Sequence, residues 1–524
     1  MKRLVCAALL IWVLGLGPWA AAAAGGEGTL LDPSSVPAGW VLVGEYLASP
    51  AELAEFSARL GVTLQELVNY TFATPQGTIQ VNLVLTGTDG EAESLQQLFL
   101  SIHPPELVGR SGRRVMEIIT ELPELADLAR EALVFQRAEN LSPVEPSVLR
   151  EYLEGWSWTV ATWEDLTWHL GRELDSYRVF LVGESHGAAF NQGLQTALVE
   201  FMVKEGQVRH LLLELSPSLV GFLREYVRTG DEALLQLAFA QVQGTYFFTQ
   251  ENYAHWQSIR ALQEELPPGE ELRLIGLDVE HQPLMALRYL QHLLSKVPEE
   301  SWSSTKLAQI DQVLTGELRL DYAEAVLFTE HLLLELETAQ LQEALGELWG
   351  EFELVLSSLL AGLQLQSVSG PAWNNGRDAA MYHNLLKQIS LDGGEKYFGQ
   401  WGVNHVFQGQ QMGVDWLAAR LAGTEGFAGS VFSLVLIYSA GEHLSQDGLQ
   451  VLPLDTYRST AVPLLADLAG KEPLLVKLDG LESPFSRNQL WPLKEAVPLS
   501  GVTTDYFQYI LLVPGAGAST PLGL

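Results

Sequence analysis

One short segment of the chain, residues 177–187 (YRVFLVGESHG), places three side chains that can do chemistry between two glycines. Glu184, Ser185 and His186 supply a carboxylate, a hydroxyl and an imidazole. A histidine held by a carboxylate is a suitable general base for hydrolysis. In an extended segment, residues two positions apart point the same way, so the side chains of Glu184 and His186 can converge. The segment is therefore the first candidate for a catalytic site.

The residues around this segment predict a strand, a turn and a helix. Residues 178–182 are almost continuously apolar, which is typical of a strand buried on both faces. Residues 190–205 carry apolar side chains at helical spacing. A strand followed by a helix forms half of a βαβ unit, and open α/β sheets bind ligands just beyond the carboxyl ends of their strands. We therefore expect the site at such a strand end.

Two further buried strands are predicted at residues 208–215 and 271–278, and both end in carboxylates. Glu214 stands at the end of the first strand, and Asp278 stands at the end of the second, followed by His281. The pattern of strand, carboxylate and helix thus recurs along the chain. We expect Asp278 and His281 to line the same cleft as Glu214.

A fourth strand, predicted at residues 396–401, runs into His405. Because the carboxyl ends of parallel strands meet at one edge of a sheet, we expect Glu184, His186, Glu214 and His405 to converge in one site. Further strands are expected at residues 431–437, 474–478 and 506–513.

Composition limits the possible partners of the protein. The chain has 524 residues, of which 47% are hydrophobic, so it can bury a large core. Its formal net charge is −34, and such a surface repels phosphate backbones and anionic lipids. We therefore expect a small-molecule substrate and no nucleic-acid partner. The sequence does not indicate an oligomeric state.

The first residues have the pattern of a secretory signal. Residues 1–24 contain a charged start, an apolar stretch and a run of alanines, and residues 25–39 predict a tether. Cys6 is the only cysteine, so the cleaved chain would have no disulfide, no cysteine nucleophile and no Cys-bound zinc. We expect an exported protein, periplasmic or secreted, without stable membrane insertion after cleavage. An uncleaved membrane anchor is the alternative.

The rest of the chain predicts two domains. Residues 40–120 indicate a small α+β domain of unknown role, including a short helix that begins after Thr63. A proline-containing connector is expected at 121–155. Residues 156–524 predict an α/β domain with a mainly parallel sheet flanked by helices. Residues 283–369 are helical by periodicity and predict a large helical insertion, which we expect over the strand ends.

One interpretation of the 183–187 segment is a serine hydrolase. The sequence GESHG matches the G-x-S-x-G nucleophile elbow, and Ser185, Asp278 and His405 follow in the chain order of such a triad. Two observations argue against this interpretation. The segment follows the first strand of its domain, whereas an elbow normally follows several strands, and no His-Gly-Gly type loop precedes it.

The order of motifs from residue 156 to residue 437 resembles the erythromycin esterase family. That family belongs to a wider superfamily, which includes ChaN-like haem-binding proteins and Tiki-like proteins. Each motif alone is weakly specific, but all of them occur here in the same order with compatible spacing. The matching segments are GESHG (183–187), LE (213–214), IGLD (275–278), RDAAMYHN (377–384) and WGVNHV (401–406).

The resemblance implies a hydrolase in which a histidine activates water, with no cofactor expected. It assigns the role of general base to His186 and the orienting carboxylates to Glu184 and Glu214. It makes His405 the second histidine of the site. The residues matching the supporting helix motif are Arg377, Asp378 and Asn384.

The chain departs from the esterase pattern in two ways. The esterases place two residues between the glutamate and the histidine of the first motif, whereas this chain has only Ser185, which is closer to the ChaN-like and Tiki-like proteins. Their late motif also carries an additional histidine, where this chain has Gly402 or Val403. Two histidines and two glutamates can also bind a divalent metal that acidifies water. A metal-dependent hydrolase and a haem- or metal-binding protein therefore remain alternatives.

Overall fold

The computed structural model describes most of the chain. The predicted signal, residues 1–24, lies outside the described residues, as do most of the tether and most of residues 121–143. The described residues are 30–31, 36–37, 39–48, 50–104, 107–111, 113–120, 122, 125–126, 129, 135–136, 144–303, 305–459, 461–494, 498 and 501–523.

The N-terminal part contains a five-stranded antiparallel sheet in the order β2-β3-β4-β6-β5. Alternate residues of its strands face two separate apolar cores, one of which includes helix α3. A two-stranded pair of β1 (Leu30–Leu31) and β7 (Phe135–Gln136) is separate from this sheet. The elements are β2 (Val41–Leu47), α2 (Pro50–Leu60), β3 (Leu64–Ala73), β4 (Thr78–Thr86), α3 (Asp89–Leu100), β5 (Val108–Ser111) and β6 (Arg114–Ile119).

The prediction of a short helix after Thr63 is wrong, because the chain continues there as strand β3. Val68, Tyr70 and Phe72 alternate along this strand and are buried on one face of the sheet. Aromatic and β-branched residues at a period of two favour a strand, and pairing with both β2 and β4 fixes that choice.

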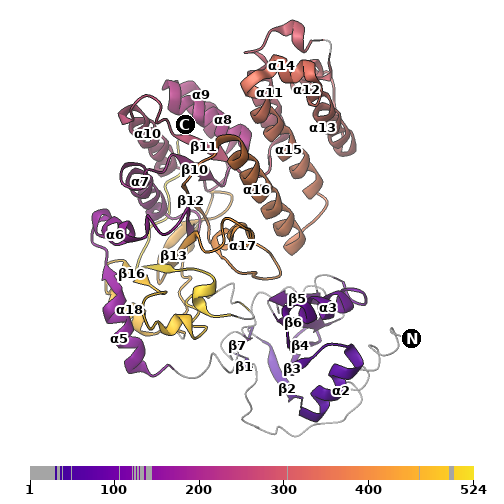
Figure 1. Cartoon of the computed structure of the whole chain (residues 1–524), viewed down its shortest axis with the longest axis vertical. Helices are drawn as coiled ribbons and strands as arrows, with labels where there is room; N and C mark the ends of the chain where they lie inside the picture. Colours follow the sequence, from indigo (N-terminus) through magenta and orange to yellow (C-terminus); the bar gives the residue numbers. More distant parts are fainter. Residues whose placement is uncertain are drawn as a thin grey trace.

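The larger sheet has eight strands in the order β11-β10-β12-β9-β13-β17-β16-β8 (Figure 1). The pairings from β11 to β17 are all parallel, whereas β16 is antiparallel to both of its neighbours. The carboxyl ends of the first six strands therefore lie at one edge. The eight strands of the sheet are β8 (Ser157–Thr159), β9 (Val179–Glu184), β10 (His210–Leu213), β11 (Arg273–Gly276), β12 (Tyr397–Gly402), β13 (Val431–Tyr438), β16 (Leu474–Lys477) and β17 (Tyr509–Val513).

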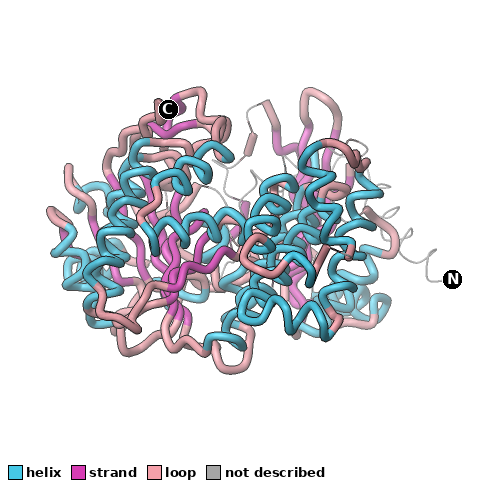
Figure 2. The backbone as a smooth tube through the Cα atoms, turned by 90° about the horizontal axis from the view of Figure 1, so that it is seen from above, coloured by secondary structure: helices cyan, strands magenta, loops and turns pink. Residues whose placement is uncertain are grey.

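The apolar strand β9 is buried on both faces, as its sequence predicts. Phe180 and Val182 belong to one core, and Val179 and Leu181 belong to the other. Figure 2 shows the strands running between helices. The first core includes residues of α7 (Ala189–Lys204), α8 (Pro217–Thr229), α9 (Glu232–Gln241) and α10 (Gln250–Glu265), and the second includes residues of α5 (Pro146–Trp156), α16 (Gly370–Asp392), α17 (Leu417–Ala422) and α18 (Leu464–Ala469).

Helix α5 lies within the segment expected as a connector, yet it packs against the larger sheet. Leu149, Tyr152 and Leu153 are buried in the second core, and the Tyr152 hydroxyl donates to the carbonyl of Lys477 in β16 at 2.8 Å. The α/β domain therefore includes helix α5, which forms the C-terminal end of the expected connector. The remaining helix of this region is α6 (Trp163–Leu170).

The segment after β11 forms helices, as its periodicity predicts. One of its helices, α15, reaches the strand ends: the backbone N–H of Glu280 donates to the carbonyl of Ser358 at 3.1 Å. The shorter helices α12, α13 and α14 lie farther from the sheet in Figure 1. The helices are α11 (Pro283–Leu294), α12 (Gln309–Thr315), α13 (Tyr322–Leu336), α14 (Ala339–Leu345) and α15 (Trp349–Leu365).

Among the described residues, one helical stretch, Ala339–Leu365, is long and apolar enough to cross a membrane by length and composition alone. Its second part, α15, has buried residues that include Phe352, Val355 and Leu359, and these lie in the first core. That packing is the pattern of a core helix.

Candidate active site

The carboxyl ends of four neighbouring parallel strands bring the predicted site residues together. Glu184 is the last residue of β9, and Glu214 directly follows β10. Asp278 lies just beyond β11, and His405 lies in the short 3-10 helix Val403–Val406 after β12. Contacts described below link all of these side chains with His186. The strand ends therefore place Glu184, Glu214, Asp278 and His405 at one edge of the sheet.

His186 is held through one ring nitrogen. Its Nδ1–H donates to Oε1 of Glu184 at 3.0 Å. The second oxygen of Glu184 accepts a hydrogen bond from the Gln400 side chain. The His186 side chain keeps 30% of its surface exposed, whereas that of Glu184 keeps 8%. This arrangement fixes the tautomer of the neutral ring and leaves Nε2 as the free proton acceptor.

The surroundings of His186 favour its protonated form. Burial acts to lower the pKa of His186, but the hydrogen bond to Glu184 and the negative charge of Glu214 outweigh it and raise the pKa above 6.5. A base of this kind takes up a proton readily near neutral pH and retains it until it can be passed on.

Glu214 lies opposite Nε2 of His186 and is held from three sides. Its Oε2 accepts from the backbone N–H of Gly402 at 2.7 Å, and its Oε1 accepts from Nη2 of Arg377 at 2.8 Å. Nε2 of His405 lies 3.2 Å from the same Oε1. Burial acts to raise the pKa of Glu214, but the cations His405 and Arg377 outweigh it and hold the pKa well below its usual range. Glu214 is therefore a carboxylate at neutral pH.

Arg377 connects Glu214 to Asp278. Its Nε and Nη2 donate to the two oxygens of Asp278 at 2.8 and 2.7 Å, which is a bidentate pair. His281 also donates to Asp278, from Nε2 at 2.9 Å. Burial acts to raise the pKa of Asp278, but Arg377 and His281 hold it far below its usual range. Cζ of Arg377 lies over the ring of Trp373, 5.4 Å from its centroid.

His405 has both ring nitrogens engaged. Nδ1–H donates to Oδ1 of Asp378 at 2.9 Å, and Nε2 faces Glu214. Burial acts to lower the pKa of His405, but the charges of Glu214 and Asp378 outweigh it and raise the pKa to about 9. His405 is thus an imidazolium at neutral pH, and it braces Glu214. The edge of its ring packs against Trp416 at a centroid distance of 5.3 Å.

Asn384, which the helix motif also includes, supports the site from a distance. Its side-chain amide donates to the carbonyl of Leu277 at 2.8 Å and to the hydroxyl of Ser358 at 3.0 Å. It therefore fixes the backbone that precedes Asp278 and does not face His186. The helix motif thus splits into site members, Arg377 and Asp378, and one structural residue.

Ser185 does not have the surroundings of a nucleophile. Its backbone carbonyl accepts a hydrogen bond from the Asn191 side chain at 2.8 Å, and within the described chain its hydroxyl makes no hydrogen bond to a histidine. The ring nitrogens of His186 and His405 face carboxylates instead. Ser185 is also not among the positive-φ residues, so it lacks the strained backbone typical of a nucleophile elbow.

Gly402 permits the close approach of His186. The register of β9 and β12 pairs Glu184 with Gly402, and a Cβ on Gly402 would lie 2.9 Å from Nε2 of His186. Any larger residue would therefore press on the catalytic nitrogen. The sequence does not indicate this role of Gly402, because only the strand register brings it next to the imidazole.

Two segments distant in sequence fix the loop that follows His186. The carbonyl of Gly187, whose φ is +84°, accepts backbone hydrogen bonds from Leu444 at 3.0 Å and from Ser519 at 2.9 Å. A Cβ on Gly187 would meet the Leu444 carbonyl oxygen at 2.5 Å, so only glycine fits. Leu444 belongs to a hairpin of β14 (Glu442–Leu444) and β15 (Val451–Pro453).

Two site residues carried a weak signal or none in the sequence. Gln400 is a buried polar residue within the apolar strand β12, a pattern that usually means a specific partner. Tyr246 lies in the loop between α9 and α10, where no motif points to it, yet its ring stacks on His186 at a centroid distance of 4.5 Å.

The donor set around Glu214 already contains a permanent cation. The guanidinium of Arg377 lies between Glu214 and Asp278, where a divalent ion would otherwise bind their oxygens. Within the described part of the chain, no group of three or more His, Cys, Asp or Glu side chains is arranged to hold a metal ion. A metal would have to displace Arg377, so the residues do not fit one in this arrangement.

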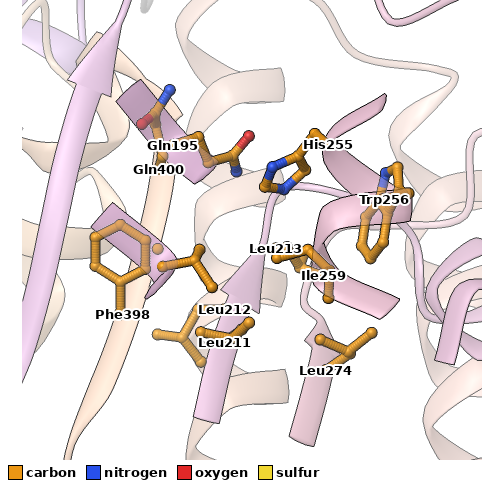
Figure 3. A pocket seen from close by; sticks show the side chains of 12 residues that line it. Gln195, Leu211, Leu212, Leu213, His255, Trp256, Ile259, Leu274, Phe398 and Gln400 are labelled. Carbon is orange, nitrogen blue, oxygen red and sulfur yellow. The ribbon is translucent and has the colours of Figure 1, made fainter. Parts of the chain in front are cut away.

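A small cavity lies behind the site, between the sheet and helices α7 and α10 (Figure 3). Its volume of about 10 Å³ is enough for one water molecule and far below that of a ligand site. A cavity of about 450 Å³ lies along the edge strand β11, lined by residues that include Arg224, Trp349 and Glu351. Neither cavity is lined by His186, whose side chain is 30% exposed.

No protein-family model and no curated protein matches the chain. Solved structures do match. A protein from Bacillus cereus is 17% identical with a TM-score of 0.55, and the match covers 73% of this chain and all of that one. A mutant of erythromycin esterase EreC in its open conformation is 16% identical with a TM-score of 0.52, covering 69% and 96%.

A third solved structure, a succinoglycan biosynthesis protein, is 14% identical with a TM-score of 0.52, covering 72% of this chain and 99% of that one. At these identities the similarity shows the fold alone. The chain therefore shares a mixed α/β fold with these solved structures, one of which is a mutant of erythromycin esterase.

Proposed function

We propose that this protein is a hydrolase that cleaves an ester or a related bond of a small molecule with water activated by His186. One observation carries the proposal. Nδ1 of His186 is committed to Glu184, and Nε2 lies 3.7 Å from Oε2 of Glu214 beside the exposed face of the ring. A water molecule between these atoms would contact a base and a hydrogen-bond acceptor at once. The fold shared with erythromycin esterase supports the same class of reaction.

In this mechanism, Nε2 of His186 takes a proton from water as the water oxygen bonds to the carbonyl carbon. The carbonyl π electrons move to oxygen and form a tetrahedral oxyanion. When the oxyanion collapses, the bond to the leaving oxygen breaks, and the imidazolium returns its proton to that oxygen. Glu184 stabilises the imidazolium, and Arg377 and His405 keep Glu214 ionised and in place.

We further propose that the protein is exported and that its activity needs neither a metal nor haem. The signal-like pattern of residues 1–24 supports export, and the intact mass of protein from the native host tests it: retention of Met1 to Ala24 would contradict cleavage. The position of Arg377 among the carboxylates supports metal independence, which activity after chelation and an absorption spectrum of the purified protein test.

The decisive experiment compares His186→Ala with Ser185→Ala on a panel of chromogenic esters and a macrolide lactone. His186→Ala should reduce kcat on the order of a hundredfold or more, because proton transfer is lost. Ser185→Ala should change kcat little, and a phosphonate probe should not label Ser185. Equal loss in both variants with labelling at Ser185 would favour an acyl-enzyme. No activity together with bound haem would favour a binding protein.

A further inference from the structure

Tyr246 covers one face of the imidazole of His186, although the two residues belong to different segments. The rings are 4.5 Å apart between centroids, and their planes differ by 7°. Such a parallel stack fixes the plane of the imidazole in addition to the single hydrogen bond from Nδ1 to Glu184. Tyr246 is therefore part of the immediate surroundings of the proposed base.

The loop that carries Tyr246 is fixed at several points. The backbone N–H of Tyr246 donates to the carbonyl of Gln446 at 3.2 Å, in the loop of the β14–β15 hairpin. The Thr245 hydroxyl donates to the carbonyl of Val242 at 2.8 Å. Phe248, at the end of the loop, accepts a backbone hydrogen bond from Leu522 at 3.1 Å. The position of the tyrosine is thus set by the fold and not by a freely moving loop.

The phenol of Tyr246 lies close enough to the charged side chains of the site for Glu214 and Glu184 to act on it. Burial and the charges of Glu214 and Glu184 raise the pKa of this phenol, so it is neutral and keeps its proton at any ordinary pH. Across the described residues, no group accepts a hydrogen bond from it. The hydroxyl oxygen is also not among the fully buried polar atoms that lack a partner, and the residue is partly exposed.

We propose that Tyr246 is a further catalytic residue, which stacks on His186 and donates its phenol hydrogen bond to the oxygen that becomes negatively charged during hydrolysis. This inference rests on the proposed function. A neutral donor held in a partly buried site stabilises a developing oxyanion without having to be desolvated or reoriented during the reaction. Arg377 and His405, the two cations of the site, already interact with carboxylates.

Two substitutions separate the hydroxyl from the ring. Tyr246→Phe keeps the stack and removes only the donor, whereas Tyr246→Leu removes both. Tyr253→Phe is the matched control, because its hydroxyl contacts the exposed Glu232 at 3.0 Å and lies outside the site. The readouts are kcat, KM, the pH dependence of kcat, and the affinity of phenyl methylphosphonate, a stable tetrahedral anion, measured by calorimetry.

Tyr246→Phe should lower kcat on the order of a hundredfold with little change in KM, and should weaken phosphonate binding by about tenfold or more. Its pH profile should keep the position of the wild type, whereas that of Tyr246→Leu should move. A Tyr246→Phe variant with wild-type kcat and phosphonate affinity overturns this inference while leaving His186 as the base.

The phosphonate measurement needs no turnover, so the two proposals can fail separately. If the wild type cleaves none of the esters but binds the phosphonate, and Tyr246→Phe weakens that binding, hydrolysis is overturned and the donor role of Tyr246 stands. If the wild type neither cleaves the esters nor binds the phosphonate, both proposals are overturned.

Discussion

Nε2 of His186 lies 3.7 Å from Oε2 of Glu214, which is too far for a direct hydrogen bond. The gap is maintained because the backbone N–H of Gly402 and the guanidinium of Arg377 hold Glu214 from other directions. A base and a carboxylate that cannot bond to each other can both bond to a molecule between them. The same contacts determine what substitutions in the site should do.

Glu184→Gln should lower the pKa of His186. The carboxylate stabilises the imidazolium, and the amide keeps the shape but loses the charge. Because the neutral imidazole is the active form, the acidic limb of the kcat profile should move to lower pH, and the plateau should fall by about tenfold. NMR titration of the imidazole measures the pKa directly. Glu200→Gln, which removes an exposed partner of Lys204, is the control, and an unmoved His186 pKa would contradict the assigned contact.

Arg377→Met should destabilise the fold. It would leave the buried carboxylates of Glu214 and Asp278 without their shared cation, and breaking a buried pair typically costs about 3–5 kcal/mol. Urea unfolding at neutral pH gives the free energy of unfolding. Lys494→Met, which breaks the exposed pair with Asp455, should change it by less than about 1 kcal/mol. Similar small losses in both variants would show that the Arg377 network contributes little.

The free energy of unfolding should fall above neutral pH because of His405. Its pKa is raised from 6.5 to about 9 in the folded protein, so its contribution is complete below pH 6.5 and is lost as the pH rises through 9. At about 1.4 kcal/mol per pKa unit, this rise corresponds to about 3 kcal/mol. Urea unfolding at pH 6.5 and above pH 9 tests it. His405→Gln should lose this dependence, whereas the exposed-site variant His383→Gln should retain it.

Gly402→Ala should reduce activity while the protein remains folded. The φ of Gly402 is −52°, which alanine adopts without strain, but the new Cβ would lie 2.9 Å from Nε2 of His186. Displacement of the imidazole should lower kcat by at least about tenfold. Gly155→Ala is the control, because no atom lies within 4 Å of its added Cβ. Full activity in Gly402→Ala would mean that the ring can shift without cost.

Patterns within short segments of the sequence predicted the strands and helices that depend mainly on local sequence. Strand β9 is buried on both sides, as its apolar run from Val179 indicates, and Glu214 and Asp278 end neighbouring strands. Strand β3 was missed, because the residues after Thr63 also suit a helix and only pairing with β2 and β4 decides between the two.

The same difference between local patterns and long-range contacts applies to the site. Glu184, His186, Glu214, Arg377, Asp378 and His405 stand in recognisable segments, so their convergence was predictable. Tyr246 was not, because its stacking on His186 depends on how a loop, a hairpin and the C-terminal segment pack together. Nor does spacing reveal that His405 is held as a cation, since that follows from the carboxylates on both of its nitrogens.

The hydrogen bond from Ser519 to the carbonyl of Gly187 also sets an order of events during protein synthesis. His186 leaves the ribosome long before Ser519 does, so the nascent chain carries the base without the segment that fixes its loop. Contacts between residues so distant in sequence form slowly, because a large loop must close first. The newly made polypeptide is therefore expected to stay inactive until residues 516–522 have been released and docked, and a truncation that removes them should give a protein that contains every motif but not the assembled site.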